Sequence, residues 1–235
     1  MNQTAGPKTM LVSTSHHFIF VHIPKTAGTS IDLALRDHSL PRATRGRHLL
    51  AKLNPFPVAP DRVVMPMHST AAQIRRKMGS EAYAQFTSFA FVRNPFDHAL
   101  SHYEYLKLYR YERVARRVAS MSIEEYLRWR MAARPWDRTL QTGRFVHLPD
   151  QAAFVVDGKG KVIVDRVMKF ETLTSDFERL CRELKVPVAP LEHRRKTERA
   201  ERSNLREQLS DQAVGLIRRL YARDFELFGY SAEPN

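Results

Sequence analysis

Cysteine is almost absent from this chain, which has one in 235 residues. A lone thiol forms no internal disulfide, and Cys181 follows Phe177 and Leu180 at helical spacing, which predicts a buried structural thiol. Long apolar runs are also missing, because no stretch reaches the roughly 18 residues that a membrane-spanning helix needs. Residues 1–17 lack a basic segment followed by an apolar one, so they do not have the form of a secretory signal.

Acidic side chains are the minority among the charged ones. The chain has 25 aspartates and glutamates against 38 lysines and arginines, which gives a formal net charge of +13 and a pI near 10.2. Such a surplus points to anionic partners, among them a phosphate-bearing donor, an acidic acceptor or a nucleic acid. Charge alone selects none of these, because basic side chains also cover many ordinary protein surfaces.

Internal repeats and low-complexity tracts are missing as well. The 235 residues, 43% of them hydrophobic, are enough for a substantial core and are typical of one globular domain. We expect residues 1–17 to be a flexible lead-in, residues 18–230 to form the domain and residues 231–235 to be a tail.

The segment from Phe18 to Leu35 has the form of a strand, a polar turn and a helix. After an apolar run and Pro24, the turn consists of Lys25, Thr26, Ala27, Gly28, Thr29 and Ser30. The N–H groups and the dipole of a helix start attract anions, and Lys25 adds a full positive charge. Small residues at positions 27 and 28 would let an anion approach the backbone closely. The segment therefore predicts a phosphate-binding loop.

This turn differs in order from a Walker A loop. That motif places glycine directly before its lysine, whereas Lys25 precedes Gly28, the one glycine of the turn. The residues thus predict an anion at a helix start and leave the type of nucleotide open. An ordinary strand, turn and helix with a hydroxyl cap would show the same pattern.

Strand and helix patterns alternate along the rest of the chain. Apolar runs predict strands at 63–67, 86–92 and 161–170, and the candidate helix N-caps are Thr70, Asn94, Ser122, Ser175 and Ser210. The alternation predicts an α/β fold, a single domain with a mainly parallel central sheet flanked by helices. Ligands of such folds bind at the carboxyl ends of the strands, so the residues after Ile23, Met67 and Val92 are candidates for one site.

Four segments resemble one protein family. HIPKTAGTS, at residues 22–30, is similar to the 5′-phosphosulfate-binding loop of sulfotransferases that use 3′-phosphoadenosine 5′-phosphosulfate (PAPS). FAFVRNPFDHALSHYEY, at 89–105, resembles the 3′-phosphate-binding element of that family, and 168–186 and 216–230 resemble later parts of it. The most similar branch includes heparan sulfate 2-O-sulfotransferase and small bacterial carbohydrate sulfotransferases. The resemblance implies a P-loop-nucleoside-kinase-like sulfotransferase fold.

The resemblance also implies a reaction, the in-line transfer of a sulfuryl group from PAPS to an acceptor hydroxyl. Lys25 would stabilise the leaving phosphate, and residues 26–30 would surround the 5′-phosphate. Arg93, at a strand end, and Ser101, about two turns up the next helix, would hold the 3′-phosphate. Arginine suits this role because it can bind phosphate through two hydrogen bonds. No metal is expected.

The acceptor hydroxyl must lose a proton, and histidine is suited to accept it near neutral pH. His68 follows a predicted strand, and the proposed base of the family is a histidine in a comparable position; its competing role is capping or packing. His22, inside an apolar run, is interpreted as a core residue. His98 and His102 have i, i+4 spacing, but no HExxH motif or cysteine ligand accompanies them, so we expect no zinc site.

Two positions depart from the family pattern. His98 stands where relatives usually have arginine, which removes one supporting charge near the 3′-phosphate. The basic segment 192–206 departs because Arg194 and Arg195 stand where relatives have less charged residues. Its Lys196 and Thr197 match a lysine–hydroxyl pair in a loop that closes on the adenosine in relatives. We expect both to contact the donor, although a solvated charged segment would have the same composition.

The sequence leaves the acceptor unidentified, with candidate acceptor segments at 40–60, 107–120 and 132–150. The first two are rich in basic residues, namely Arg42, Arg45, Arg47, Lys52, Lys107, Arg110, Arg113, Arg116 and Arg117. These favour an acidic saccharide over a small hydroxyl metabolite or a lipid. Because the anchor of the animal relatives is missing, we expect a soluble bacterial protein of the cytoplasm. The oligomeric state stays open.

Two other functions remain open at this level. A small-molecule kinase using a nucleoside triphosphate would explain Lys25 and its turn, but a Walker A loop and an evident Mg²⁺-binding aspartate motif are missing. A non-enzymatic polyanion-binding protein would explain the charge but not the strand, turn and helix. The chain has no RNP-like aromatic motif, so nucleic acid is not expected as a partner.

Overall fold

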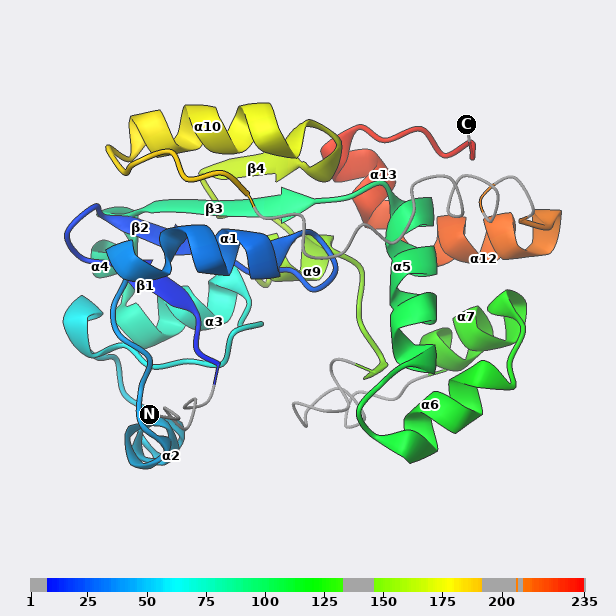
Figure 1. Ribbon diagram of the computed structural model, residues 1–235, viewed down its shortest axis with the longest axis horizontal. Coiled ribbons are helices and arrows are strands. Elements are labelled where there is room, and N and C mark those ends of the chain that lie inside the picture. The colour runs from blue at the N-terminus through cyan, green and yellow to red at the C-terminus, as the bar shows by residue number, and fades with distance from the viewer. Residues whose placement is uncertain (1–7, 133–145, 192–205, 207–208, 235) are drawn as a thin grey trace. The chain divides into compact units, whose positions relative to one another are not determined.

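The computed structural model describes residues 8–132, 146–191, 206 and 209–234 (Figure 1). The chain divides into two compact units, each built from two separate stretches of sequence. Unit 1 consists of Met1–Val92 and Ala153–Arg194, and unit 2 consists of Arg93–Ala152 and Arg195–Asn235.

Unit 1 contains a four-stranded sheet with the strand order β1-β2-β3-β4. The strands are β1 (Leu11–Ser13), β2 (Phe18–Phe20), β3 (Thr87–Val92) and β4 (Arg166–Lys169). β2, β3 and β4 are parallel neighbours, whereas β1 pairs antiparallel with β2. The predicted α/β class with a mainly parallel sheet is therefore confirmed.

Helices surround this sheet within unit 1. They are α1 (Gly28–Leu35), α2 (Arg45–Leu53), α3 (Ala71–Met78), α4 (Ser80–Ala84), α9 (Ala152–Val155) and α10 (Leu173–Glu183), with 3-10 turns η1 (Arg36–His38), η2 (Pro60–Arg62) and η4 (Phe170–Thr172). Figure 1 shows α1 beside β2 and α10 beside β4. Helix α9 crosses the boundary between the units, because Ala152 belongs to unit 2 and residues 153–155 belong to unit 1.

The core of unit 1 lies between one face of the sheet and helices α1 and α10. Phe18 and Phe20 of β2 and Phe89 and Phe91 of β3 are buried together with residues of both helices. Cys181 of α10 belongs to this cluster, and burial raises the pKa of its thiol to about 11. The prediction of a buried structural thiol is thereby confirmed.

Unit 2 is built from helices among its described residues. They are α5 (Pro95–Lys107), α6 (Glu112–Ala119), α7 (Ile123–Met131), α12 (Asp211–Leu220) and α13 (Ala222–Phe228). Apolar side chains of α5, α7 and α12 form its core, with Phe96, Tyr126 and Ile217 fully buried.

Local sequence signals placed most helix starts correctly. Thr70 and Ser122 each form a complete capping box with the residue three positions later. Asn94 caps α5 by accepting a hydrogen bond from the N–H of Phe96, and Ser210 caps α12. The predicted cap at Ser175 is wrong, because α10 begins earlier, at Leu173.

Three predictions about strands and ends need correction. Strand β1, Leu11–Ser13, lies within the predicted lead-in of residues 1–17, and its pairing with β2 buries it. Residues 63–67 form only an isolated bridge at Pro66, since proline lacks the N–H that would continue a ladder. The strand predicted at 161–170 is confined to Arg166–Lys169.

The acceptor segments predicted at 40–60 and 107–120 contain helices α2 and α6 in addition to loops. Residues 133–145, Lys196 and Thr197 lie outside the described residues. Among the helices that the structure describes, none has the length and apolar character needed to cross a bilayer.

Candidate functional site

The turn between β2 and α1 has an unusual backbone. Lys25 and Ala27 have positive φ angles of 69° and 65°, which non-glycine residues adopt only at a cost of about 1–3 kcal/mol each. Thr26 lies between them, fully buried, and its hydroxyl donates a 2.9 Å hydrogen bond to the carbonyl of Ile23. Strained backbone of this kind concentrates at ligand-binding turns, where N–H groups converge on an anion.

Helix α1 begins at this turn with a positive end that its own side chains do not neutralise. Its N-cap residue, Ala27, provides no side-chain hydrogen bond, and the first turn of the helix contains no acidic residue. The first acid, Asp32, forms ion pairs with Arg36 and Arg42. The helix start therefore keeps the electrostatic character of an anion site.

Gly28 is required here for a reason that the sequence did not show. A Cβ atom at this position would lie 1.8 Å from Nε2 of His22, so only glycine leaves room for that ring. The ring of His22 also stacks on Phe20, with centroids 5.2 Å apart. The small size of residue 28 thus admits His22, whereas the sequence had suggested that it serves the approach of an anion.

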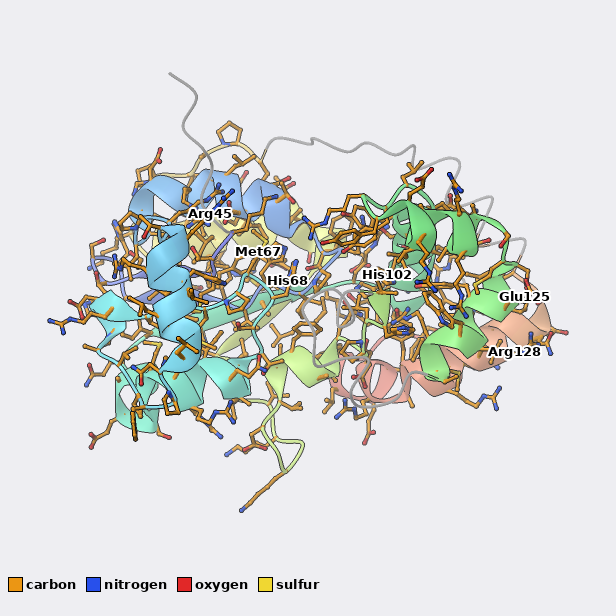
Figure 2. All side chains as sticks on the ribbon, turned by 90° about the horizontal axis from the view of Figure 1, so that it is seen from below. Arg45, Met67, His68, His102, Glu125 and Arg128 are labelled. Carbon is orange, nitrogen blue, oxygen red and sulfur yellow. The ribbon has the colours of Figure 1, made fainter. Side chains whose placement is uncertain are left out.

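His22 in turn contacts His68, which lies in the stretch before α3 and is labelled in Figure 2 beside Met67. Their ring centroids are 4.5 Å apart in an edge-to-face arrangement, and Nδ1 of His68 lies 3.0 Å from the carbonyl oxygen of His22. A carbonyl only accepts hydrogen bonds, so Nδ1 of His68 is the donor and carries the proton. In the neutral ring the basic nitrogen is then Nε2.

Both rings of this histidine pair (His22 and His68) favour the neutral state. Burial lowers the pKa of His68 from 6.5, and its bond to the His22 carbonyl opposes this only in part. The pKa of His22 is lowered well below 6.5 by burial and, next, by the adjacent ring of His68. The predicted core position of His22 is confirmed by its burial, whereas no local pattern in the sequence indicates its contact with His68.

Arg93 and Ser101 belong to unit 2, with Arg93 just before helix α5 and Ser101 within it. Arg93 directly precedes Asn94, the N-cap of that helix. Their exposed fractions are 5% and 8%. The side chain of Gln151 bonds both backbone groups of Arg93, accepting from its N–H at 2.8 Å and donating to its carbonyl at 2.8 Å. No sequence motif pointed to Gln151.

His98 and His102 lie in the core of unit 2, and both are fully buried. Nδ1 of His98 is 2.9 Å from the hydroxyl of Tyr221, and Nδ1 of His102 is 2.5 Å from the hydroxyl of Tyr126. Arg130 is buried beside the same tyrosines and donates to the hydroxyl of Tyr221 at 2.9 Å. Within the described part of the chain, no group of three or more histidine, cysteine or acidic side chains is arranged to hold a metal ion.

The remaining predicted residues differ in exposure. Lys25, Ala27 and Ser30 are half-buried, whereas Thr29 is exposed. Each lies on the turn or the first turn of α1, as the sequence predicted. The hydroxyl of Thr26 donates its proton to the carbonyl of Ile23, so Thr26 can donate to a phosphate only through its N–H group.

Comparison with known proteins gives two similarities. The family model described as the sulfotransferase family matches residues 8–231, which includes nearly all of both units. A crystal structure of a sulfotransferase from Alicyclobacillus acidocaldarius is similar at a TM-score of 0.44 and 20% identity, over 97% of this chain and 98% of that chain. A search of curated proteins gives no match. Because the family model spans almost the whole sequence, the chain belongs to the sulfotransferase family.

Proposed function

We propose that this sulfotransferase takes its sulfuryl group from PAPS and transfers it to the hydroxyl of a saccharide. The observation that carries the proposal is the 3.0 Å contact between Nδ1 of His68 and the carbonyl of His22, which makes Nε2 the basic nitrogen of a neutral ring. The ring of His22 packs on Gly28 at the start of α1, so the base belongs to the same cluster as the anion-binding turn.

The chemical step needs a base and a stabilised leaving group. The acceptor oxygen attacks sulfur while the bond between sulfur and the bridging oxygen of the 5′-phosphate breaks. The proton of the acceptor passes to Nε2 of His68, which leaves a sulfate ester and 3′-phosphoadenosine 5′-phosphate as products. A general base contributes about 10²- to 10⁴-fold to such a rate.

Lys25 and the start of α1 stabilise the leaving phosphate in this proposal. Negative charge develops on the bridging oxygen, and preorganised positive groups lower the energy of that state. The positive φ angles of Lys25 and Ala27 and the lack of an acid in the first turn of α1 support this role. Residues 26–29 provide N–H groups for the 5′-phosphate, and Ser30 contributes its hydroxyl, because its N–H already donates to the carbonyl of Ala27.

Arg93 and Ser101 hold the 3′-phosphate in the same proposal. β2 and β3 are parallel neighbours, so the chain leaves both strands at the same edge of the sheet. Arg93 is bonded directly to Val92, the last residue of β3, so its backbone starts from that edge. Lys196 and Thr197 are proposed as further donor contacts on the strength of the sequence resemblance alone.

An acidic saccharide is the acceptor class that the surface supports best. Helix α2 exposes Arg45, labelled in Figure 2, and Arg47, and its first turn contains no acid. Several other basic residues are already paired, since Arg42 bonds Asp32 and Arg116 bonds Glu112. Arg45 and Arg47 on α2 are therefore one source of attraction for an acidic acceptor, beside other exposed basic residues such as Arg113.

Thermal stability with added nucleotides tests the donor. At about 100 times its dissociation constant, 3′-phosphoadenosine 5′-phosphate should stabilise the protein by roughly 2.7 kcal/mol. Stabilisation by ATP with Mg²⁺ and none by the bisphosphate would contradict the proposal in favour of a kinase. Stabilisation by RNA alone would favour a polyanion-binding protein.

Transfer from radiolabelled PAPS tests the acceptor. Acidic oligosaccharides, neutral oligosaccharides, phenols and lipid alcohols are compared as acceptors, and the acidic oligosaccharides should be labelled best. The double variant Arg45→Ala, Arg47→Ala should raise KM for the acidic oligosaccharide and leave KM for the donor unchanged. Equal labelling of neutral and acidic oligosaccharides would overturn the acidic assignment.

A further inference from the structure

The backbone of Arg93 is held by a side chain from a distant part of the sequence. Gln151 is fully buried, and its amide accepts from the N–H of Arg93 and donates to the carbonyl of Arg93, both at 2.8 Å. Arg93 follows the last residue of β3, so its peptide groups have passed the end of the ladder. Buried peptide groups require partners, and Gln151 provides both, as a neighbouring strand would.

Asp224 of α13 holds Gln151 in one orientation. Its carboxylate accepts from Nε2 of Gln151 at 3.0 Å, from the N–H of Gln151 at 2.9 Å and from the N–H of Ala152 at 2.8 Å. Nε2 thus lies between two acceptors, the carboxylate and the carbonyl of Arg93, so it must be the NH₂ end. The amide of Gln151 cannot flip without losing bonds at both ends.

An ion pair beside this network fixes the same two segments. Arg223 and Asp150 form two hydrogen bonds of 2.7 Å each, next to Asp224 and Gln151 along the chain. Bidentate pairs of this kind have a defined geometry as well as favourable energy. The segment before α9 and the start of α13 are therefore joined at two consecutive positions.

We propose that Gln151 and Asp224 are positioning residues that set the direction of Arg93 toward the 3′-phosphate of the donor. This inference rests on the proposed function, because it assigns Arg93 to that phosphate. The backbone torsions at Arg93 set the direction in which its side chain leaves the main chain, and Gln151 fixes both peptide groups that flank its Cα. Asp224 acts through Gln151, and neither residue needs to contact the donor.

Recognition of the 3′-phosphate separates this role from a purely structural one. Adenosine 5′-phosphate lacks the 3′-phosphate but shares the rest of the nucleotide, so its binding does not depend on the direction of Arg93. The two ligands are titrated calorimetrically into the wild type, Gln151→Glu and Asp224→Asn. Gln151→Glu keeps an acceptor for the N–H of Arg93 and loses the donor to its carbonyl. Asp224→Asn preserves the shape of the side chain and provides the same comparison should Gln151→Glu not fold.

The expected result is a selective loss. Both variants should bind 3′-phosphoadenosine 5′-phosphate about tenfold more weakly, which is the range for one charge-linked hydrogen bond, and adenosine 5′-phosphate within about twofold of the wild type. Tyr221→Phe is the matched control, because it removes hydrogen bonds from the buried Arg130 and His98 in the same unit. It should lower the melting temperature and preserve the ratio of the two affinities.

Two contrary results have different meanings. Equal losses for both nucleotides in Gln151→Glu and Asp224→Asn would show that the network serves only the fold, and would overturn this inference alone. A wild type that binds both nucleotides equally would overturn the donor assignment and, with it, this inference.

Discussion

Burial affects the charge of the histidine pair of unit 1 and the charge of Arg93 of unit 2 differently. In unit 1, burial lowers the pKa of His68 and His22, so both rings are held in the neutral state. In unit 2, Arg93 is nearly buried yet remains charged, and its backbone is linked through Gln151 to the carboxylate of Asp224. Burial thus removes the charge in one unit, whereas in the other the charge persists because a guanidinium does not lose its proton in proteins.

The difference matches the two tasks of the proposed reaction. A base must arrive without a proton, and desolvation ensures this because it disfavours the charged form of histidine. A residue that binds phosphate must keep its charge, and arginine does so even when buried. The comparison therefore predicts that changes in the histidine pair affect the rate of transfer, whereas changes in the network of Arg93, Gln151 and Asp224 affect the affinity for the donor.

The largest effect is expected when the base is removed. His68→Ala should lower kcat by about 10²- to 10⁴-fold, the usual contribution of a general base. Calorimetric binding of 3′-phosphoadenosine 5′-phosphate should stay unchanged, because His68 acts on the acceptor. The matched control is His38→Ala in η1, which should keep wild-type transfer. Full transfer by His68→Ala would show that the base lies elsewhere.

A smaller effect is expected from closing the space that His22 occupies. Gly28→Ala puts a methyl group 1.8 Å from Nε2 of His22, so the ring must move and His68 with it. Overpacking of this kind costs about 1–3 kcal/mol of unfolding free energy, measurable by urea denaturation, and transfer should fall as well.

In unit 2 an added methyl group should instead raise the unfolding free energy, because Gly215 in α12 has no atom within 4 Å of an added Cβ. Gly215→Ala should stabilise by about 0.4–1 kcal/mol, and equal effects at both glycines would break the comparison.

The sequence predicted the parts of the site that depend on local order. The turn at 24–30 could be located from an apolar run, a proline, a lysine and a helix start, since each is a property of neighbouring residues. The caps at Thr70, Asn94 and Ser122 were predicted for the same reason. The strand at 63–67 failed because its pattern ignored what Pro66 does to a ladder.

The parts that the sequence did not predict depend on contacts between distant residues. Gln151 and Asp224 are separated by 73 positions, and Arg93 and Gln151 by 58, so no local pattern links them. The packing role of Gly28 was not predicted, because the ring that fills the space beside it belongs to His22, six positions earlier on the strand side of the turn. One signal was present in the sequence, namely a histidine within an apolar run. Burying an imidazole costs free energy unless it has a polar partner, so His22 could have been expected to contact another polar group.

The pH dependence of stability should have opposite signs for the two units. For His68 and His22 the unfolded state binds more protons below pH 6.5, so their contribution to stability is lost as the pH falls through that range. For Asp224, burial and then the nearby Asp150 raise the pKa from 3.8 to about 7, so the folded state binds the extra proton and stability falls as the pH rises between these values. One such proton changes the unfolding free energy by at most about 1.4 kcal/mol per pH unit.

Asp224→Asn separates these opposing contributions. The variant loses the contribution of Asp224, which falls as the pH rises, and keeps that of His22 and His68, which increases with pH. Its unfolding free energy should therefore increase more steeply with pH than that of the wild type from pH 4 to 6.5. Urea denaturation at four or five pH values measures the two slopes. Identical slopes would mean that Asp224 is already ionised across this range in the folded protein. The three N–H groups that donate hydrogen bonds to it would then stabilise the charged form.

The smallest expected effect is a shift of the pH dependence of kcat/KM, which the lowered pKa of His68 causes. Because burial lowers the pKa of His68 below 6.5, most of the base is neutral at pH 6.5, and kcat/KM should reach its plateau at a lower pH than an ordinary histidine would give. Its acid limb should lie below pH 6.5 and reflect the pair, since His22 and His68 are in contact and protonation of either ring opposes that of the other. Steady-state rates from pH 5 to 8 with saturating donor measure this limb, and His38→Ala should reproduce the wild-type profile. A limb centred above pH 6.5 would require a raised pKa for the base, which burial of a neutral ring cannot provide, and would place the proton acceptor outside the histidine pair.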